Sequence, residues 1–437
     1  MRRRSAAALI VTLVVVGVCC SDSGHRMTRP ISNARRPVPT TQQKTAPCTA
    51  DPGLAAPNAP VPPDVVFAVQ RFANDPGLTG DRVGLSIWID GLGEVGALAP
   101  DVPLLPASNQ KLLTAMGVLS VLNPGARLTT VVQTTPDRGL AIVGGGDPSL
   151  TARGPNSLDA LAAQVRAAGV TSVSGPLVVD ESRYDGIRRA GQWQDSEVPA
   201  YAGPLSALMV DDNRYRRDAG FLADPALANG EAFRFALAAH GVAVSGPTVH
   251  GVAAPKGPVI ASLTSAPVSA LLTDTLLRSD NMAAEELLKE VGHSTGAPGS
   301  TARGLALTRA ALAPLCVPLA GTDDDGSGLS PADNRSPREW RELLQAARAQ
   351  PWFPLLRGAL PLAGRSGTLS TRFRRTAAEG NVRAKTGTIP GGIALSGYGT
   401  TAGGRGFVFS VLVNGARAPA AERPLDALIT AIAAHPG

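Results

Sequence analysis

The chain has 437 residues, of which 44% are hydrophobic, and this composition is typical of a globular protein. At this length one compact core is not expected, so we predict two domains with additional segments. The formal net charge of +6 comes largely from arginines scattered along the chain. No basic stretch is interleaved with aromatic residues, which argues against single-strand binding, and we expect no nucleic-acid partner.

The N-terminus has the pattern of an export signal. Three arginines, residues 2–4, precede an apolar run, Ala6–Cys20, which is shorter than the roughly 20 residues of a membrane-spanning helix. We therefore predict that residues 1–22 are a signal peptide or a membrane anchor. The adjacent cysteines Cys19 and Cys20 leave lipidation open as a third alternative.

Residues 23–63 are rich in Pro, Thr, Ala and Arg and end in APNAPVPP, which predicts an exported linker without a core of its own. Apart from the apolar run, the chain has two cysteines, Cys48 and Cys316. In an exported protein such a pair favours a disulfide that ties the linker to the main body; two inert buried thiols are the alternative. The chain has no CxxC pair and its five histidines are dispersed, so we expect no metal site and no cofactor.

Ordered structure is expected to begin near Asp64. The segment VGLSIWID (Val83–Asp90) alternates like a strand and is followed by the turn sequence GLGE. A helix is predicted to start within PASNQKLLTAM (Pro106–Met116), because apolar residues recur there at helical spacing. Two strand-like segments follow, ARLTTVVQTT and LAIVGGGDPSL, and then a helix–glycine–strand pattern that occurs twice before about residue 255.

The C-terminal part changes character. The stretch SAPVSALLTDTLLRSDNMAAEELLKEVG predicts two helices around a polar break at Arg278–Asn281. Near the end, three strand-like segments with short glycine-bearing turns are suited to antiparallel pairing, and a helix follows them. These segments are NVRAKTGTIPG, IALSGYGTT, GRGFVFSVLVNG and, for the helix, LDALITAIAAH.

The first candidate site is the pair Ser108 and Lys111. Residues three apart on a helix face the same way, so the hydroxyl and the amine can meet. A desolvated lysine with a lowered pKa can act as the base that makes a serine nucleophilic, whereas arginine stays charged. Only five of the 41 lysine and arginine residues are lysines, so a lysine here indicates a function that arginine cannot perform. A capping serine followed by a surface lysine is the alternative.

Two further motifs carry suitable chemistry. Ser279 and Asn281 lie in the break between two predicted helices, where they could relay a proton and bind a peptide group; helix capping is the alternative. The segment KTGT, Lys385–Thr388, combines a cation and hydroxyls, which suit a terminal carboxylate, with a glycine that allows close backbone approach. A strand of this kind can receive an extended substrate as an added strand.

In this order, the motifs SxxK, SxN and KTG resemble those of the penicilloyl-serine transferases, which include β-lactamases and penicillin-binding proteins. β-Lactamases and simple carboxypeptidases usually have a short stretch between the first two motifs, whereas here it is long, which implies an inserted domain at about residues 150–255. Further phrases are similar to the class C low-molecular-mass penicillin-binding proteins, the D-alanyl-D-alanine carboxypeptidase/endopeptidase family (peptidase family S13). These phrases are PASNQKLLTA, GGGDPSLT, GPLVVDESRYDG, YAGPLSALMVDDN, LLRSDNMAAEELL, DGSGLSPADN, LPLAGRSGTLSTRF and GNVRAKTGT.

This resemblance covers about Asp64 to the C-terminus and implies a multi-domain α+β fold. Residues 64–149 and 256–437 would form a β-lactamase/transpeptidase-like antiparallel sheet flanked by helices, interrupted by one α/β-type domain at 150–255. The activity implied is that of a serine D-Ala-D-Ala carboxypeptidase, or also an endopeptidase, acting on peptidoglycan stem peptides outside the cytoplasmic membrane. β-Lactams would be covalent inhibitors.

The resemblance also implies roles for single residues. Ser108 would be the acylated nucleophile and Lys111 its base, and Ser279 would pass a proton to the leaving D-alanine with Asn281 beside it. The carboxylate-binding strand would comprise Lys385, Thr386, Gly387 and Thr388, and the backbone N–H groups of Ser108 and Thr388 would form the oxyanion hole.

The resemblance also implies substrate-binding roles for two further pairs of residues, and each pair could instead belong to an ordinary turn. Ser327 and Gly328, in the sequence DGSG, resemble a loop that lines the cleft; a simple turn is the alternative. Asp180 and Tyr184, in DESRYDG, are similar in position to residues that grip the amino end of a meso-diaminopimelate side chain in related proteins; a capped turn is equally compatible.

Three other functions remain as alternatives. The sequence GHSTG (Gly292–Gly296) fits a nucleophile elbow, although a predicted helix, not a strand, precedes it. A β-lactamase would need a group that activates the deacylating water, and no ExxLN-like segment lies between the first two motifs. A non-catalytic wall-binding protein on the same fold would typically have lost the nucleophile or its base, and both are present.

Overall fold

The computed structural model describes residues 60–195, 198, 200–213, 224–254 and 257–437. The predicted export signal, most of the predicted linker and Cys48 lie outside this part. The α-helices are α1 (Pro63–Ala73), α2 (Gln110–Val121), α3 (Leu158–Ala167), α4 (Pro225–Ala239), α5 (Val268–Arg278), α6 (Asn281–His293), α7 (Thr301–Leu312), α8 (Pro337–Ala347), α9 (Phe353–Ala359) and α10 (Glu422–Ala433). None of these described helices is long and apolar enough to cross a lipid bilayer.

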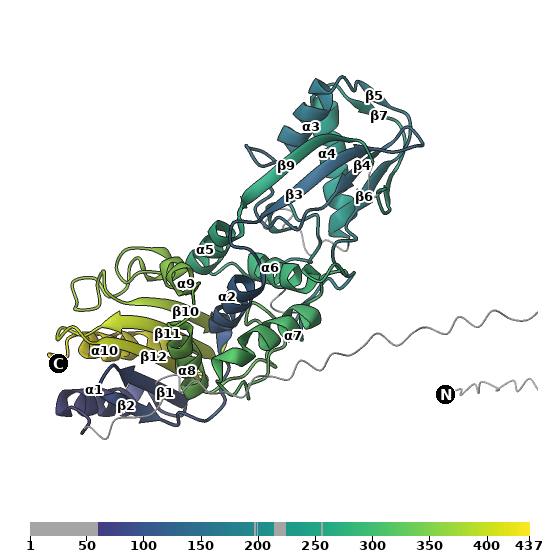
Figure 1. The fold of residues 1–437 in the computed structure, drawn as a ribbon. Helices are drawn as coiled ribbons and strands as arrows, with labels where there is room; N and C mark the ends of the chain where they lie inside the picture. Colours follow the sequence, from purple (N-terminus) through teal and green to yellow (C-terminus); the bar gives the residue numbers. More distant parts are fainter. Residues whose placement is uncertain (1–59, 196–197, 199, 214–223, 255–256) are drawn as a thin grey trace, which may run out of the picture. The chain divides into compact units, whose positions relative to one another are not determined.

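The strands form two main sheets (Figure 1). They are β1 (Arg82–Ile89), β2 (Gly93–Leu98), β3 (Arg127–Thr134), β4 (Leu140–Val143), β5 (Ser172–Val173), β6 (Leu177–Asp180), β7 (Ala243–Val244), β8 (Thr248–His250), β9 (Val259–Pro267), β10 (Arg383–Ile389), β11 (Gly392–Thr400) and β12 (Gly406–Asn414).

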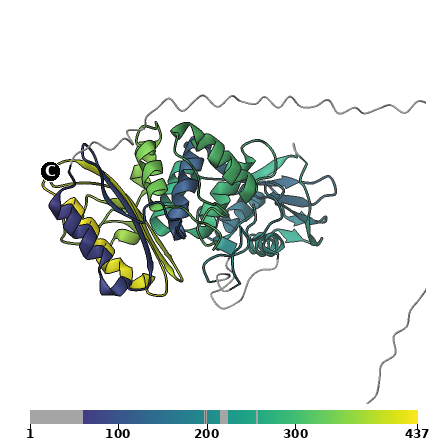
Figure 2. The same ribbon diagram turned by 90° about the horizontal axis from the view of Figure 1, so that it is seen from below.

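The first sheet has five strands in the order β10-β11-β12-β1-β2, and all neighbouring pairs are antiparallel. Helices α1 and α10 cover one face and α8 covers the other (Figure 2). Alternation along β12 explains this layering, because Phe409 and Val411 join the core of α1 and α10 while Val408 and Leu412 join the core of α8. The expected α+β class, with an antiparallel sheet flanked by helices, is confirmed.

The second sheet has the order β8-β6-β4-β3-β9, in which β4, β6 and β8 are parallel and β3 is antiparallel to β4 and β9. Helices α3 and α4 pack against it around a separate apolar core. The sheet therefore runs from Arg127 to Pro267 and includes strands on both sides of the segment 150–255. Strand patterns alone do not reveal which sheet a strand joins, because its pairing partners come from elsewhere in the chain.

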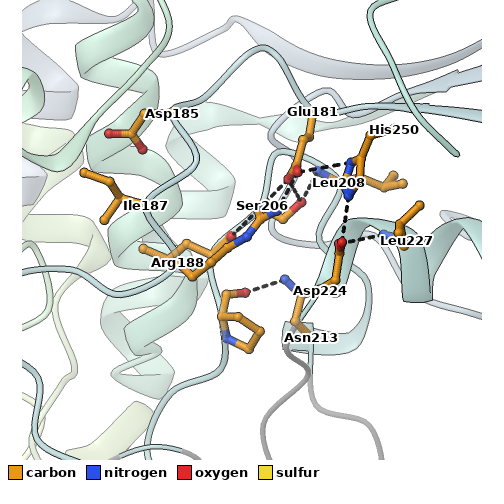
Figure 3. A network of polar contacts seen from close by, with 12 residues as sticks. Glu181, Asp185, Ile187, Arg188, Ser206, Leu208, Asn213, Asp224, Leu227 and His250 are labelled. Carbon is orange, nitrogen blue, oxygen red and sulfur yellow. Dashed lines mark hydrogen bonds and ion pairs between the residues drawn. The ribbon is translucent and has the colours of Figure 1, made fainter. Parts of the chain in front are cut away.

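A polar network joins the loop after β6 to the N-terminus of α4 (Figure 3). The guanidinium of Arg188 donates two hydrogen bonds to the carboxylate of Glu181, each of 2.5 Å, and the hydroxyl of Ser206 donates a third of 2.8 Å. His250 lies between Glu181 and Asp224, with its Nε2 2.7 Å from the Asp224 carboxylate. These contacts hold four segments of the chain against one another, at Glu181–Arg188, Ser206, Asp224 and His250.

Helix α2 positions the first sequence motif. It packs against α5, α6 and α7, and all of its residues from Gln110 to Leu119 are buried. A helix that is buried all round places its polar residues in the interior as well. The amine of Lys111 is thereby removed from water, which is the setting that the predicted base requires.

Candidate active site

Ser108 lies in a short 3-10 turn, η2 (Ala107–Asn109), that leads directly into α2. The turn is held in an uncommon conformation, because Ala107 has a φ of 47° although it is not glycine. Two glycines let other segments approach it. A Cβ at Gly328 would lie 1.9 Å from the Ala107 carbonyl oxygen, and one at Gly387 would lie 2.9 Å from the Pro106 carbonyl oxygen. The loop after Asp325 and the strand β10 are therefore packed directly against the turn that carries Ser108.

The side chain of Lys111 meets Ser108 as the spacing predicted. Its Nζ lies 2.9 Å from the Ser108 hydroxyl oxygen, 2.6 Å from Asn281 Oδ1 and 2.7 Å from the Ser327 carbonyl oxygen. Asn281 Nδ2 donates to the Tyr201 carbonyl at 2.9 Å, which turns Oδ1 of the amide toward Lys111. Because Asn281 Oδ1 and the Ser327 carbonyl can only accept, they take both hydrogens of a neutral amine and leave its lone pair facing the Ser108 hydroxyl.

Burial changes the proton affinity of this lysine. Lys111 is 1% exposed, and burial lowers its pKa to about 8, against the opposing effect of acidic groups nearby. These groups are Asp325, Glu285, Asp280 and Asp333. A lysine with this pKa has a free amine in a useful fraction of molecules near neutral pH.

The break between α5 and α6 presents the second motif. Ser279 ends α5 in a left-handed conformation with a φ of 58°, and the Asp280 carboxylate caps α6 by accepting the N–H of Ala283 at 3.0 Å. Asp280 thus takes the capping role, while the side chains on either side of it bond to lysines. Asn281 contacts Lys111, and the Ser279 hydroxyl accepts a hydrogen bond of 2.8 Å from Lys385.

Lys385 lies on β10, an edge strand whose one strand neighbour in the described chain is β11. Its side chain is fully buried, and burial, together with the charge of Lys111, holds its pKa well below the usual value. The hydroxyl of Thr386 donates to the hydroxyl of Thr368 at 2.7 Å, and Thr388 is exposed. The structure thus brings Ser108, Lys111, Ser279, Asn281 and Lys385 together in one cluster.

Ser327 and Gly328, which the sequence predicts to line the cleft, lie beside this cluster. The Ser327 side chain is fully buried, and its hydroxyl donates to Asp325 at 3.1 Å. The Asp325 carboxylate also accepts four backbone N–H groups, from Ser327 to Ser330, and the indole N–H of Trp193 at 2.7 Å. The loop therefore supports Lys111 and the turn that carries Ser108, and its role as a lining of the cleft stays a prediction.

Asp180 and Tyr184 do not join the cluster. One carboxylate oxygen of Asp180 accepts the N–H of Ser182 and the other accepts that of Ala253, as in a capped turn. The buried Tyr184 hydroxyl donates to Glu290 at 2.7 Å. Glu290 is nine positions after Asn281 on α6, or about 13 Å along the helix axis. Both side chains thus have structural bonds in this structure, and their role in binding the substrate stays a prediction.

The GHSTG alternative fails on geometry. Ser294 follows the end of α6, not a strand, and its hydroxyl donates to the Val291 carbonyl at 2.7 Å. His435 lies beside Asp64, with 2.7 Å between Nδ1 and the carboxylate. No group of three His, Cys, Asp or Glu side chains is placed to hold a metal ion in the part of the chain that the structure describes.

Comparison with known proteins agrees with this arrangement. The model of the D-Ala-D-Ala carboxypeptidase 3 (S13) family matches residues 66–220 and 219–434. The D-alanyl-D-alanine carboxypeptidase of an Actinomadura species is 32% identical over 84% of both chains, and the carboxypeptidase DacB of Mycolicibacterium smegmatis is 32% identical over 98% of this chain and 96% of its own. The crystal structure of penicillin binding protein 4 from Haemophilus influenzae has the same fold, with a TM-score of 0.73 at 21% identity over 83% of this chain and 97% of that one. The chain belongs to the S13 family of D-Ala-D-Ala carboxypeptidases.

Proposed function

We propose that this protein removes the terminal D-alanine from peptidoglycan stem peptides through an acyl-enzyme on Ser108. The observation that carries the proposal is the contact of 2.9 Å between the buried Lys111 amine and the Ser108 hydroxyl. Family membership supports the reaction type, and the geometry supports the roles of the residues.

In the acylation step, Lys111 takes the hydroxyl proton while Ser108 Oγ attacks the carbonyl carbon of the penultimate D-alanine. The bond to the terminal D-alanine nitrogen then breaks, and an ester to Ser108 forms. Backbone N–H groups of Ser108 and Thr388 would stabilise the oxyanion, since β10 packs against the turn that carries Ser108. Water later attacks the ester by the same route and regenerates Ser108.

Ser279 is suited to carry the proton to the leaving amine. Its hydroxyl accepts a hydrogen bond from Lys385, so its own hydrogen is not needed for that contact and can be donated to the departing nitrogen. Lys111, protonated in the first step, would resupply that hydrogen. This relay conserves the proton between the serine nucleophile and the product amine.

Lys385 would bind the terminal carboxylate of the substrate. Its pKa is lowered in the free enzyme, chiefly by burial, and an arriving carboxylate favours the protonated form. Thr386, Gly387 and the exposed Thr388 continue along the open edge of β10, where an extended peptide can add as a strand. β-Lactams, whose ring presents a carboxylate and an acylating carbonyl, would occupy the same positions as covalent inhibitors.

A direct test is to incubate the protein with fluorescent penicillin and to map the labelled peptide by mass spectrometry. We expect the label on Ser108, and none in a Ser108→Ala variant. A Ser294→Ala variant serves as the control and should label normally. Label on any other residue, or release of D-alanine by the Ser108→Ala variant, would refute the assignment.

The location and the domain limits belong to the same proposal. We infer that the protein acts outside the cytoplasmic membrane, with residues 1–22 as a signal or an anchor. We also infer that Cys48 pairs with Cys316, which non-reducing peptide mapping would test by the presence of a linked peptide. The sheet topology supports an inserted domain built on the strands between Arg127 and Pro267, within a catalytic domain formed by the chain on either side.

A further inference from the structure

Glu285 is buried close to the catalytic cluster, and none of the reaction steps proposed above involves it. It follows Asn281 by four positions on α6, so both side chains lie on the same helix face. The side chain is fully buried. Its Oε1 accepts the N–H of Gly326 at 2.9 Å, and its Oε2 has no hydrogen-bond partner among the described residues. A buried carboxyl oxygen without a partner is costly, which calls for a reason to keep this residue.

The bond to Gly326 connects Glu285 to the base. The next residue is Ser327, whose carbonyl accepts from the Lys111 amine at 2.7 Å. The Gly326 carbonyl in turn accepts the hydroxyl of Thr114 at 2.7 Å, three residues after Lys111 on α2. Glu285 and Thr114 therefore hold the same peptide segment from two helices, and that segment fixes one of the acceptors of the Lys111 amine.

Charge gives a second connection. Burial and the nearby charge of Asp325 raise the pKa of Glu285 to about 8, while Lys111 opposes this rise; in the other direction, Glu285 is one of the acidic groups that favour the protonated form of Lys111. The two groups thus compete for protons over the same pH range, and a proton gained by one is stabilised by loss of a proton from the other.

We propose that Glu285 is a positioning residue for Lys111: it fixes the segment that contacts the amine, and it supplies the counter-charge for the ammonium formed when Lys111 takes the Ser108 proton. This inference rests on the proposed function, in which Ser108 is acylated with Lys111 as the base.

The other charged groups that face Lys111 are less suited to this role. The Asp325 carboxylate is occupied by backbone N–H groups, the Trp193 indole and the Ser327 hydroxyl. Asp280 caps α6 and lies 3.3 Å from Arg278.

Two groups remain on the neighbouring elements. One oxygen of Asp333 accepts the N–H groups of Asp324 and Asp325, and burial and Asp325 hold the pKa of Asp333 well above its usual range. Lys385, on β10, is basic, and when it is protonated it repels the ammonium of Lys111 instead of stabilising it. Asp333 also has a buried oxygen without a partner among the described residues, but its other oxygen holds the backbone of Asp324 and Asp325. Glu285 instead holds the N–H of Gly326, directly before the residue whose carbonyl accepts from the Lys111 amine.

The test is the pH dependence of acylation by penicillin in a Glu285→Gln variant. Glutamine has the same shape, and its oxygen can still accept the Gly326 N–H. In the wild-type protein the rate should rise with pH as Lys111 loses its proton. In the variant that rise should move to lower pH by about one unit, because the charge that Glu285 gains as it ionises near pH 8 no longer favours the ammonium. The maximal rate, reached above that pH, should fall about tenfold, because the ammonium then forms without its counter-charge. Initial noncovalent binding of penicillin should be unchanged.

Glu286→Gln is the matched control. Glu286 is the adjacent residue, is equally buried and has a pKa raised by burial to about 8, but its Oε1 accepts the N–H of Ser206 at 3.3 Å, away from Lys111. This variant should keep the wild-type pH profile. A Glu285→Asp variant, which keeps the charge, should retain the wild-type position of the rise with a lower maximal rate, and it provides a second measurement if the glutamine variant folds poorly.

The outcomes separate the two proposals. A Glu285→Gln profile that coincides with the wild-type profile would overturn the inference, and so would an equal shift in Glu286→Gln. If the wild-type protein is not acylated on Ser108 at all, the proposed function itself is wrong.

Discussion

Replacement of Lys111 by arginine keeps the positive charge and removes the base, and the structure gives a magnitude for the effect. With a pKa of about 8, roughly one Lys111 in ten carries a free amine at pH 7. At the usual lysine pKa near 10.4, the fraction would be about one in 3,000, so burial increases the population of the base by a few hundredfold. An arginine, with a pKa above about 12, would offer a free base in fewer than about one molecule in 100,000.

The expected loss of acylation in Lys111→Arg is therefore at least about ten-thousandfold at pH 7. The assay is the rate of fluorescent penicillin attachment, followed from pH 6 to pH 9.5. For the wild-type protein the rate should rise about tenfold per pH unit below the pKa of Lys111 and level off above about pH 8, because the active form is the unprotonated one.

Lys289→Arg is the matched control for burial and charge. Lys289 is also 1% exposed, but it forms an ion pair with Asp185, a role that arginine can fulfil. This variant should be acylated at nearly the wild-type rate. A Lys111→Arg protein that reacts at the wild-type rate, or a wild-type rate that does not change between pH 6 and pH 9, would refute the assignment of Lys111 as the base.

Three further predictions follow from single contacts. Lys385→Arg should raise the KM for D-Ala-D-Ala peptides about tenfold and slow acylation far less than loss of the base, since the cation is kept. A rate of penicillin labelling that falls as much as it does in Lys111→Arg would contradict a carboxylate-binding role. Gly328→Ala should lower the free energy of unfolding by about 2–4 kcal/mol, because its Cβ would lie 1.9 Å from the Ala107 carbonyl oxygen at a φ of +84°; a denaturant midpoint equal to that of the wild type would disprove this. Trp193→Phe removes a hydrogen bond to the buried Asp325 carboxylate and should lower the free energy of unfolding by about 1–3 kcal/mol. An unchanged denaturant midpoint would show that this hydrogen bond does not contribute to stability.

The parts of the site that could be predicted from the sequence depend on local geometry. Ser108 and Lys111 are three positions apart, and any helical turn brings such side chains together, so their contact follows from spacing. In the same way, the polar break at Ser279–Asn281 lies between two apolar-periodic stretches, and Lys385 lies in an alternating strand segment. These patterns predicted the local structure around each motif, and the resemblance to a known family predicted that the motifs would meet.

The sequence did not reveal which distant segments pack together. The contact of Asp180 with Ala253 joins residues 73 positions apart, and that of Tyr184 with Glu290 joins residues 106 positions apart. The strands of the second sheet that lie outside residues 150–255 likewise take pairing partners from distant parts of the chain.

The sequence by itself determined the three motifs, their local conformations and the helix and strand order of the C-terminal part. Only the tertiary structure decided that Lys111 would be buried and that Asn281, 170 positions away, would orient its amine. It also decided that Glu285 would hold the segment that contacts this amine. The physical reason is that hydrogen bonds within one helical turn are set by the chain itself. The burial that shifts a pKa comes from several segments packing together, and no single stretch of sequence contains that information.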